Sequence, residues 1–146
     1  MFKKISVIAL SLILIIIGYE LIRRNVGGFG GAYPFAETWT VNKSEKEIEY
    51  NLNKLHKKNP EAFLDANNLI LQVDRTGYWK KIDFFYADRN EIVQVLIREF
   101  DNYTSISLVS FVNKSSGETR LMNKDFTWFE NRKEKEIFES RILKYL

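Results

Sequence analysis

An apolar run near the N-terminus constrains this chain more than any other feature of its sequence. Residues 5–22, ISVIALSLILIIIGYELI, carry a single charged side chain, Glu20. As a helix this run would rise about 27 Å, which is close to the thickness of the hydrocarbon core of a bilayer. Two lysines precede the run and two arginines follow it, as is typical of the ends of a membrane span. The sequence therefore predicts a single transmembrane helix that contacts the lipid bilayer through residues 5–22.

A cleaved signal peptide and a buried core helix are the alternatives for this run. A short basic start followed by an apolar core is also the pattern of a secretory signal. The segment behind the core, GYELIRR, lacks the small residues of a cleavage site, and the Gly/Ala run at 27–32 lies about ten residues further on. We therefore expect an uncleaved anchor in a cell membrane, with the rest of the chain on the extracytoplasmic side. Secretion after signal cleavage is the alternative location.

The net charge of +3 comes from the basic residues that flank this run. Of the 22 basic and 19 acidic residues, Lys3, Lys4, Arg23 and Arg24 flank the run and one glutamate lies within it, so 18 of each sign remain for residues 33–146. A nucleic-acid binder carries a basic face that neutralises phosphates. Because the rest of the chain is formally neutral, we expect no nucleic-acid partner.

A change of composition marks the start of the folded domain. Residues 25–32 hold four glycines, whereas the 114 residues after them hold two. Such a break is typical of a flexible linker. We therefore divide the chain into a membrane anchor or uncleaved signal (1–24), a Gly-rich spacer (25–32) and a single soluble domain (33–146). The aromatic residues among positions 33–39 are expected to pack onto the sheet of that domain or onto its end.

Two capping boxes predict the helices of the domain. In SEKE (44–47) and TWFE (127–130), a hydroxyl and a carboxylate three residues apart can satisfy each other's free backbone amides at a helix start. The first helix should end at Asn59-Pro60, because the residue before proline disfavours helical backbone. Each helix repeats apolar residues along one face. On the second helix this face holds Phe138, Ile142 and Leu146.

A period of two replaces the helical pattern from Leu69 onward. Five segments alternate in this way, and short connectors rich in Asp, Asn, Ser and Gly join them, which predicts hairpins. The strands are expected at 69–73, 78–87, 91–100, 105–112 and 119–123, after a first strand at 36–41. In the segment 105–112, alternation places Leu108 and Val112 on one face and Phe111 on the other.

The expected fold class is α+β. An N-terminal single transmembrane helix is followed by a small two-layer domain, an antiparallel β-meander with a helix before it and a helix after it. Both helices should cover the same face of the sheet, so that the other face stays uncovered.

No motif in the sequence points to a reaction or a bound group. The chain has no cysteine and one histidine, His56, so thiolate chemistry is excluded and neither a multi-histidine metal site nor a His-centred triad is expected. Gly28-x-Gly30 has Tyr33 where a dinucleotide fingerprint needs its third glycine, and no strand precedes it. We therefore expect no catalytic residues, no cofactor and no metal.

One face of the strand predicted at 78–87 combines aromatic and charged residues. Alternation places Trp79, Lys81, Asp83 and Phe85 on this face, opposite three apolar residues. Aromatic side chains dominate binding hot spots, so an exposed pair of them would mark a contact surface. These four residues are the candidate binding face.

These observations favour a membrane-anchored, non-enzymatic binding or accessory module of a bacterial envelope. It would act through the uncovered sheet face on a protein, a peptide or an envelope polymer. One alternative is a small envelope hydrolase that uses two strand carboxylates, Asp83 and Glu99, since a carboxyl in apolar surroundings can serve as a general acid. A second alternative is an accessory subunit whose transmembrane helix binds a partner, with Glu20 as a contact.

Overall fold

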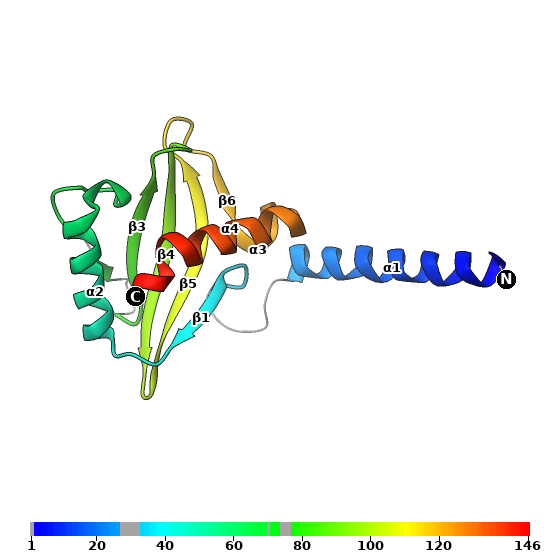
Figure 1. Ribbon diagram of the computed structural model, residues 1–146, viewed down its shortest axis with the longest axis horizontal. Coiled ribbons are helices and arrows are strands. Elements are labelled where there is room, and N and C mark those ends of the chain that lie inside the picture. Colours follow the sequence, from blue (N-terminus) through cyan, green and yellow to red (C-terminus); the bar gives the residue numbers. More distant parts are fainter. Residues whose placement is uncertain (1, 27–32, 70, 74–76) are drawn as a thin grey trace.

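The computed structural model describes residues 2–26, 33–69, 71–73 and 77–146, with side chains from Ile8 onward. Its elements are α1 (Phe2–Val26), β1 (Glu37–Val41), α2 (Glu45–Lys58), the 3₁₀ turn η1 (Pro60–Ala62), β2 (Gln72–Val73), β3 (Lys80–Tyr86), β4 (Glu91–Phe100), β5 (Tyr103–Asn113), β6 (Thr119–Leu121), α3 (Met122–Asp125), α4 (Trp128–Arg141) and the 3₁₀ turn η2 (Leu143–Tyr145). In Figure 1, α1 projects as a single rod from the layered domain that the other elements form.

Over the described residues the sheet has six strands, and every strand pair is antiparallel. Its order is β1-β5-β4-β3-β2, and β6 also pairs with β5. The chain runs from β2 to β6 as successive hairpins, whereas β1 lies at the far edge, where Glu37 is opposite Leu108. The predicted fold class is confirmed to this extent: the domain is α+β, with an antiparallel sheet and helices before and after it.

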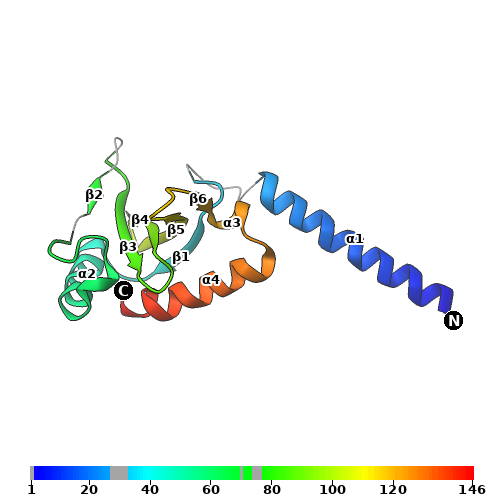
Figure 2. The ribbon, with the colours of Figure 1, turned by 90° about the horizontal axis from the view of Figure 1, so that it is seen from above.

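The core lies between the sheet and the helices α2 and α4, which cover the same side of the sheet (Figure 2). β3 contributes alternate residues to this core, as predicted. Its members include Ile82, Phe84 and Tyr86 from β3, Ile48, Leu52 and Leu55 from α2, and Phe138 and Ile142 from α4 and its C-terminal end. The indole of Trp39 on β1 packs against Phe138, with ring centres 5.1 Å apart, so the aromatic start of the domain joins this core.

Both predicted capping boxes are present. The Ser44 hydroxyl accepts a hydrogen bond from the Glu47 amide (3.3 Å), and the Glu47 carboxylate accepts one from the Ser44 amide (2.8 Å). Thr127 and Glu130 make the same pair of bonds at the start of α4, at 3.3 and 2.8 Å. The bond from the Ser44 amide lowers the pKa of the Glu47 carboxyl.

One extra residue in β5 shifts the alternation of its side chains. The pairing with β4 skips Val109, which forms a β-bulge. Beyond the bulge, Phe111 lies on the core face with Leu108 and is buried, and Val112 points to the opposite face. The prediction that Val112 shares a face with Leu108 and that Phe111 opposes it is therefore wrong, because strict alternation has no place for a bulge.

The last predicted strand, 119–123, is shorter in the structure. β6 ends at Leu121, and the short helix α3 starts at Met122. The Asp125 carboxylate accepts a hydrogen bond of 2.7 Å from the Leu121 amide, so a side chain four residues ahead holds the chain in this turn.

Two predictions fall partly on residues that the structure does not describe. Of the Gly-rich spacer predicted for 25–32, only the first two residues are described, and these belong to α1. Of the strand predicted for 69–73, β2 covers the last two residues, and residue 70 lies outside the described part.

α1 is one continuous helix over the predicted membrane segment. In the part of the chain that the structure describes, no helix is both long enough and apolar enough to cross a membrane. The large apolar side chains of α1 from Ile8 to Ile22 are between 50% and 66% exposed.

Candidate functional site

The face of the sheet away from α2 and α4 carries all four residues of the candidate binding face. We call it the open face, because the helices that cover the sheet lie on its other side (Figure 2). Lys81, Asp83 and Phe85 alternate along β3 with the buried core residues, Trp79 directly precedes β3, and each of the four is half-buried.

Each of these residues has contacts within the chain. The Lys81 ammonium lies 3.2 Å from the Asp83 carboxylate, and the Lys114 ammonium lies 4.5 Å from the ring centre of Phe85. Tyr33 packs edge-on against Trp79, with ring centres 5.8 Å apart, so the residue that opens the domain packs at the end of the sheet, as predicted. The four predicted residues are spread along one strand and do not form a compact site by themselves.

Small hydroxyl side chains fill the middle of the open face. Ser107 shares a hydrogen bond with Thr38 of β1 (2.9 Å), and the Ser110 hydroxyl donates to the Gln94 side-chain oxygen (2.7 Å). Ser105, Ser107 and Ser110 are all buried between larger neighbours. The middle of the face therefore has few side chains that project far enough to bind a ligand.

Arg98 lies at the centre of an aromatic cluster at one end of the open face. Its guanidinium carbon is 5.3 Å from the ring centre of Tyr78, 5.4 Å from that of Trp79 and 4.7 Å from that of Phe100. Phe100 in turn stacks on Tyr103, with ring centres 4.8 Å apart. Aromatic faces attract a cation, so the guanidinium holds the rings around it. We call these five residues the Arg98 cluster.

Strand register brings the Arg98 cluster together. The two-residue turn 101–102 joins β4 to β5 and sets Phe100 opposite Tyr103. Because β3 and β4 are antiparallel, the residues just before β3 lie beside the end of β4, which brings Trp79 to Arg98. The sequence prediction did not include Arg98, Phe100 or Tyr103, although Asp-Asn between two aromatic residues is a turn signal that predicts contact between them.

An open cavity of about 590 Å³ adjoins the Arg98 cluster. Its wall includes Tyr78, Arg98, Glu99, Asp101, Asn102 and Tyr103. Tyr78 is 66% exposed and Tyr103 is 37% exposed. The cavity therefore offers aromatic surface and, beside it, carboxylate, amide and guanidinium groups that can form hydrogen bonds with a ligand.

The two carboxylates considered for a hydrolase are not brought together. Asp83 lies on the open face, whereas Glu99 lies on the other face of the sheet, where its carboxylate accepts a hydrogen bond of 3.0 Å from the Glu45 amide. In the described residues no group of three or more His, Cys, Asp or Glu side chains is arranged to hold a metal ion.

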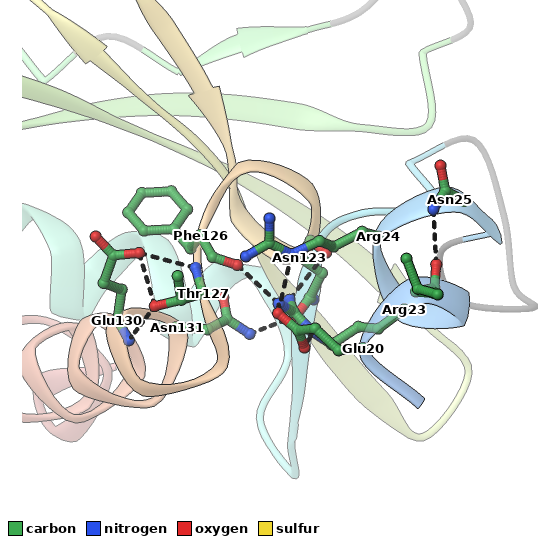
Figure 3. A network of polar contacts seen from close by, with 10 residues as sticks. Glu20, Arg23, Arg24, Asn25, Asn123, Phe126, Thr127, Glu130 and Asn131 are labelled. Atoms are coloured by element: carbon green, nitrogen blue, oxygen red, sulfur yellow. Dashed lines mark hydrogen bonds and ion pairs between the residues drawn. The ribbon is translucent and has the colours of Figure 1, made fainter. Parts of the chain in front are cut away.

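The end of α1 contacts the domain through Arg23 (Figure 3). The guanidinium donates hydrogen bonds to the backbone carbonyl oxygens of Asn123 (2.9 Å) and Phe126 (2.7 Å), on either side of the end of α3. It also donates to both carboxylate oxygens of Glu20, one turn earlier on α1, at 2.9 and 2.8 Å. Carbonyl groups at a helix end have no partner within the helix, so they are ready acceptors for this side chain.

A second cavity, of about 640 Å³, lies between the end of α1 and the start of α4. We call it the notch; its wall includes Tyr19, Ile22 and Arg23 of α1 and Trp128, Asn131 and Arg132 of α4. The Asn131 side chain donates to the side-chain oxygen of Asn123 (2.6 Å), while its own side-chain oxygen is buried and has no hydrogen-bond partner among the described residues.

A buried polar group occupies the far end of β3. The hydroxyl of Tyr86 is buried without a hydrogen-bond partner in the described part of the chain, and burial raises its pKa. The guanidinium groups of Arg141 and Arg89 lie 4.7 and 5.5 Å from the Tyr86 ring centre. Arg89 donates to both carboxylate oxygens of Glu134 (2.7 and 2.8 Å), which links the turn after β3 to α4.

Comparison with protein-family models, with curated proteins and with solved structures finds no match for this chain.

Proposed function

We propose that this chain is a membrane-anchored binding module of a bacterial envelope that binds a neutral glycan polymer at the Arg98 cluster. α1 holds the domain at the extracytoplasmic surface of the membrane, and the open face is turned to the ligand. The observation that carries the proposal is the pair of exposed rings, Tyr78 and Tyr103, beside hydrogen-bonding groups in the cavity that adjoins the Arg98 cluster.

The anchor is supported by the surface of α1. From Ile8 to Ile22, large apolar side chains are exposed along this helix and around it, which suits a helix surrounded by lipid and is unfavourable in water. The apolar run of the sequence begins at Ile5, so it extends three residues beyond the first described side chain.

The chemistry of the Arg98 cluster supports a sugar polymer as the ligand. A sugar ring has an apolar face of C–H groups and a rim of hydroxyl groups. Tyr78 and Tyr103 supply ring surface for the apolar face, and Asp101 and Asn102 supply acceptors and donors for the hydroxyl groups. Ligand sites commonly combine apolar surface with a few polar groups in this way.

The charge of the domain favours a neutral polymer over a charged one. Residues 33–146 contain 18 basic and 18 acidic side chains, so a polyanion gains no net attraction from the domain as a whole. At the site itself, aromatic rings surround the guanidinium of Arg98, and carboxylates of Glu99 and Asp101 lie nearby.

Cosedimentation with purified peptidoglycan sacculi and with chitin, a neutral glycan polymer without peptides, tests the site. The full-length protein in nanodiscs should bind them, and Tyr78→Ala and Tyr103→Ala should each weaken binding by at least about fivefold, as expected when a ring at the centre of a contact is lost. Tyr50→Ala is the matched control, because Tyr50 lies on α2, away from the open face, and is 70% exposed. It should bind like the wild type.

Two outcomes contradict the binding proposal. Competition by free stem peptides but not by glycan strands would make the ligand a peptide. Equal binding by wild type, Tyr78→Ala and Tyr103→Ala would remove the Arg98 cluster as the site.

Flotation with phosphatidylcholine vesicles tests the anchor independently. The full-length chain should float with the vesicles after an alkaline wash, and the double variant Ile15→Lys/Ile16→Lys should stay at the bottom of the gradient, because charged side chains are unfavourable at the centre of a bilayer. Leu64→Lys, a change of the same kind on the surface of the domain, should float like the wild type. A wild-type chain that stays at the bottom would refute the anchor.

A further inference from the structure

We propose that the notch between α1 and α4 binds the headgroup of an anionic phospholipid, and that Trp128 and Phe129 lie in the interfacial layer of the same leaflet. The inference rests on the proposed anchor, and it adds a specific lipid contact and a fixed orientation of the domain on the membrane.

The position of the notch supports a headgroup ligand. The apolar run of α1 ends at Ile22, so the bilayer surface lies at the level of the last turns of this helix. Tyr19 and Ile22 line one wall of the notch, and the first turn of α4 lines the other. Figure 2 shows the start of α4 beside the end of α1. The notch therefore opens at the depth where lipid headgroups lie.

Two exposed aromatic residues at the start of α4 support the same placement. Trp128 is 46% exposed and Phe129 is 78% exposed, and their rings contact each other edge-on at 4.9 Å. In a domain surrounded only by water, two adjacent exposed aromatic side chains are unfavourable. At a membrane surface they are common, because an indole ring combines an apolar body with a polar N–H group.

The charges around the notch favour a phosphate group. Three cations, Arg23, Arg132 and Lys135, and one carboxylate, Glu37, line it. Arg23 already binds Glu20 and two carbonyl groups, and Lys135 is paired with Glu37 at 2.8 Å. The partner of Arg132 is the exposed Glu136 at 3.1 Å, and such a surface pair is weak. Arg132 is therefore the side chain that can turn to a lipid phosphate.

A buried acceptor in the notch selects among headgroups. Asn131 is 4% exposed, and its side-chain oxygen has no hydrogen-bond partner among the described residues. A buried oxygen without a donor is unfavourable, so a ligand that brings a hydroxyl group gains binding energy there. Phosphatidylglycerol is the simplest anionic phospholipid whose headgroup carries hydroxyl groups beside the phosphate.

The experiment uses the full-length protein in vesicles of equal parts phosphatidylcholine and phosphatidylglycerol. One of the two lipids is brominated on its acyl chains at a time, and tryptophan quenching is measured. The difference between the wild type and Trp128→Phe isolates the signal of Trp128. We expect brominated phosphatidylglycerol to associate with this position on the order of fivefold more strongly than brominated phosphatidylcholine, as expected for one basic residue near an anionic surface.

In Arg132→Gln, the two brominated lipids should associate with Trp128 about equally, so that the ratio of phosphatidylglycerol to phosphatidylcholine is close to one. Lys133→Gln is the matched control, since Lys133 is the next residue of α4, is exposed and does not line the notch. It should keep the preference.

The outcomes separate this inference from the anchor itself. Equal quenching of Trp128 by both lipids, or an unchanged preference in Arg132→Gln, would overturn the headgroup site. Absence of Trp128 quenching in a protein that floats with the vesicles would overturn the interfacial position of α4. A protein that does not float at all would refute the anchor.

Discussion

Arg23, near the end of α1, donates a hydrogen bond of 2.7 Å to the backbone carbonyl oxygen of Phe126, 103 residues further along the chain. The side chain of Arg23 is 9% exposed, so this bond is shielded from water. Together with the bond to Asn123, it fixes the direction in which α1 leaves the domain.

Replacing Arg23 by Ala should allow α1 to take a range of directions relative to the domain. The charged hydrogen bonds to Asn123 and Phe126 are lost, and each such bond contributes about 1.5–3 kcal/mol. Because the chain has no cysteine, spin labels can be placed on Leu12→Cys and Lys54→Cys alone, and the distance between them can be measured in nanodiscs. The distance distribution should be narrow in the labelled parent and broad in Arg23→Ala.

Lys133→Ala is the control for this measurement, because Lys133 is exposed on α4 and does not line the notch. Its distribution should match that of the parent. An equally narrow distribution in Arg23→Ala would show that other contacts orient α1.

Phe84→Ala should lower the free energy of unfolding by about 3–5 kcal/mol, because Phe84 is fully buried and its removal leaves a cavity under α2. Phe129→Ala removes the same atoms from an exposed position and should change the free energy by less than about 0.5 kcal/mol. Urea unfolding followed by circular dichroism measures both values. Similar losses for the two variants would contradict the assignment of the core.

The pair Arg89 and Glu134 should behave as a buried ion pair. Glu134→Leu should cost about 2–4 kcal/mol, because it leaves the Arg89 guanidinium half-buried with Glu91 as its remaining carboxylate partner. The double variant Arg89→Met/Glu134→Leu should cost less than the sum of the two single variants, since no charge is left uncompensated.

A double-mutant cycle in urea gives the coupling energy of this pair. The same cycle on the exposed pair Arg132 and Glu136 should give less than about 0.5 kcal/mol. Additive losses at Arg89 and Glu134 would mean that the two side chains act independently.

The ion pair of Asp88 and Arg141 should make stability depend on acid pH. Arg141 donates two hydrogen bonds of 2.8 Å to the Asp88 carboxylate and lowers its pKa to about 2, against about 3.9 in an unfolded chain. Because the pKa of Asp88 is lower in the folded chain than in the unfolded chain, its ionised carboxylate stabilises the fold at pH values above the unfolded pKa. This contribution is lost as the pH falls through the folded pKa. The difference in free energy of unfolding between wild type and Asp88→Asn should therefore be constant above about pH 5, fall as the pH is lowered, and vanish only below about pH 2.

Both partners are about half exposed, so the difference at neutral pH should stay below about 1 kcal/mol. A difference that grows as pH falls would have the wrong sign for this pair.

The elements of the domain were predictable because their signals are local. Ser44 with Glu47 and Thr127 with Glu130 form helix starts within four residues, and alternation over seven residues is enough to place Phe84 in the core. The bulge at Val109 was missed because strict alternation was extended across it, although the spacing of the serines changes there from two residues (105 to 107) to three (107 to 110).

The candidate site was predictable only in part, because strand register decides it. Alternation identified Trp79 as a residue of the uncovered face, but Arg98 and Tyr103 reach it from two other strands. The contact of Arg23 with Phe126 depends on where α3 ends relative to α1, and no pattern of residues within either helix encodes that.

The pairing of β1 with β5 determines when this domain can fold during synthesis. Glu37 of β1 lies opposite Leu108 of β5, so β1 leaves the ribosome long before the strand with which it pairs. The contact of Arg23 with Phe126 becomes possible later still. The hairpins from β3 to β5 need only their neighbours in the chain, and contacts close in sequence form fastest. The growing chain therefore completes its central hairpins first and fixes the position of its own N-terminal helix last.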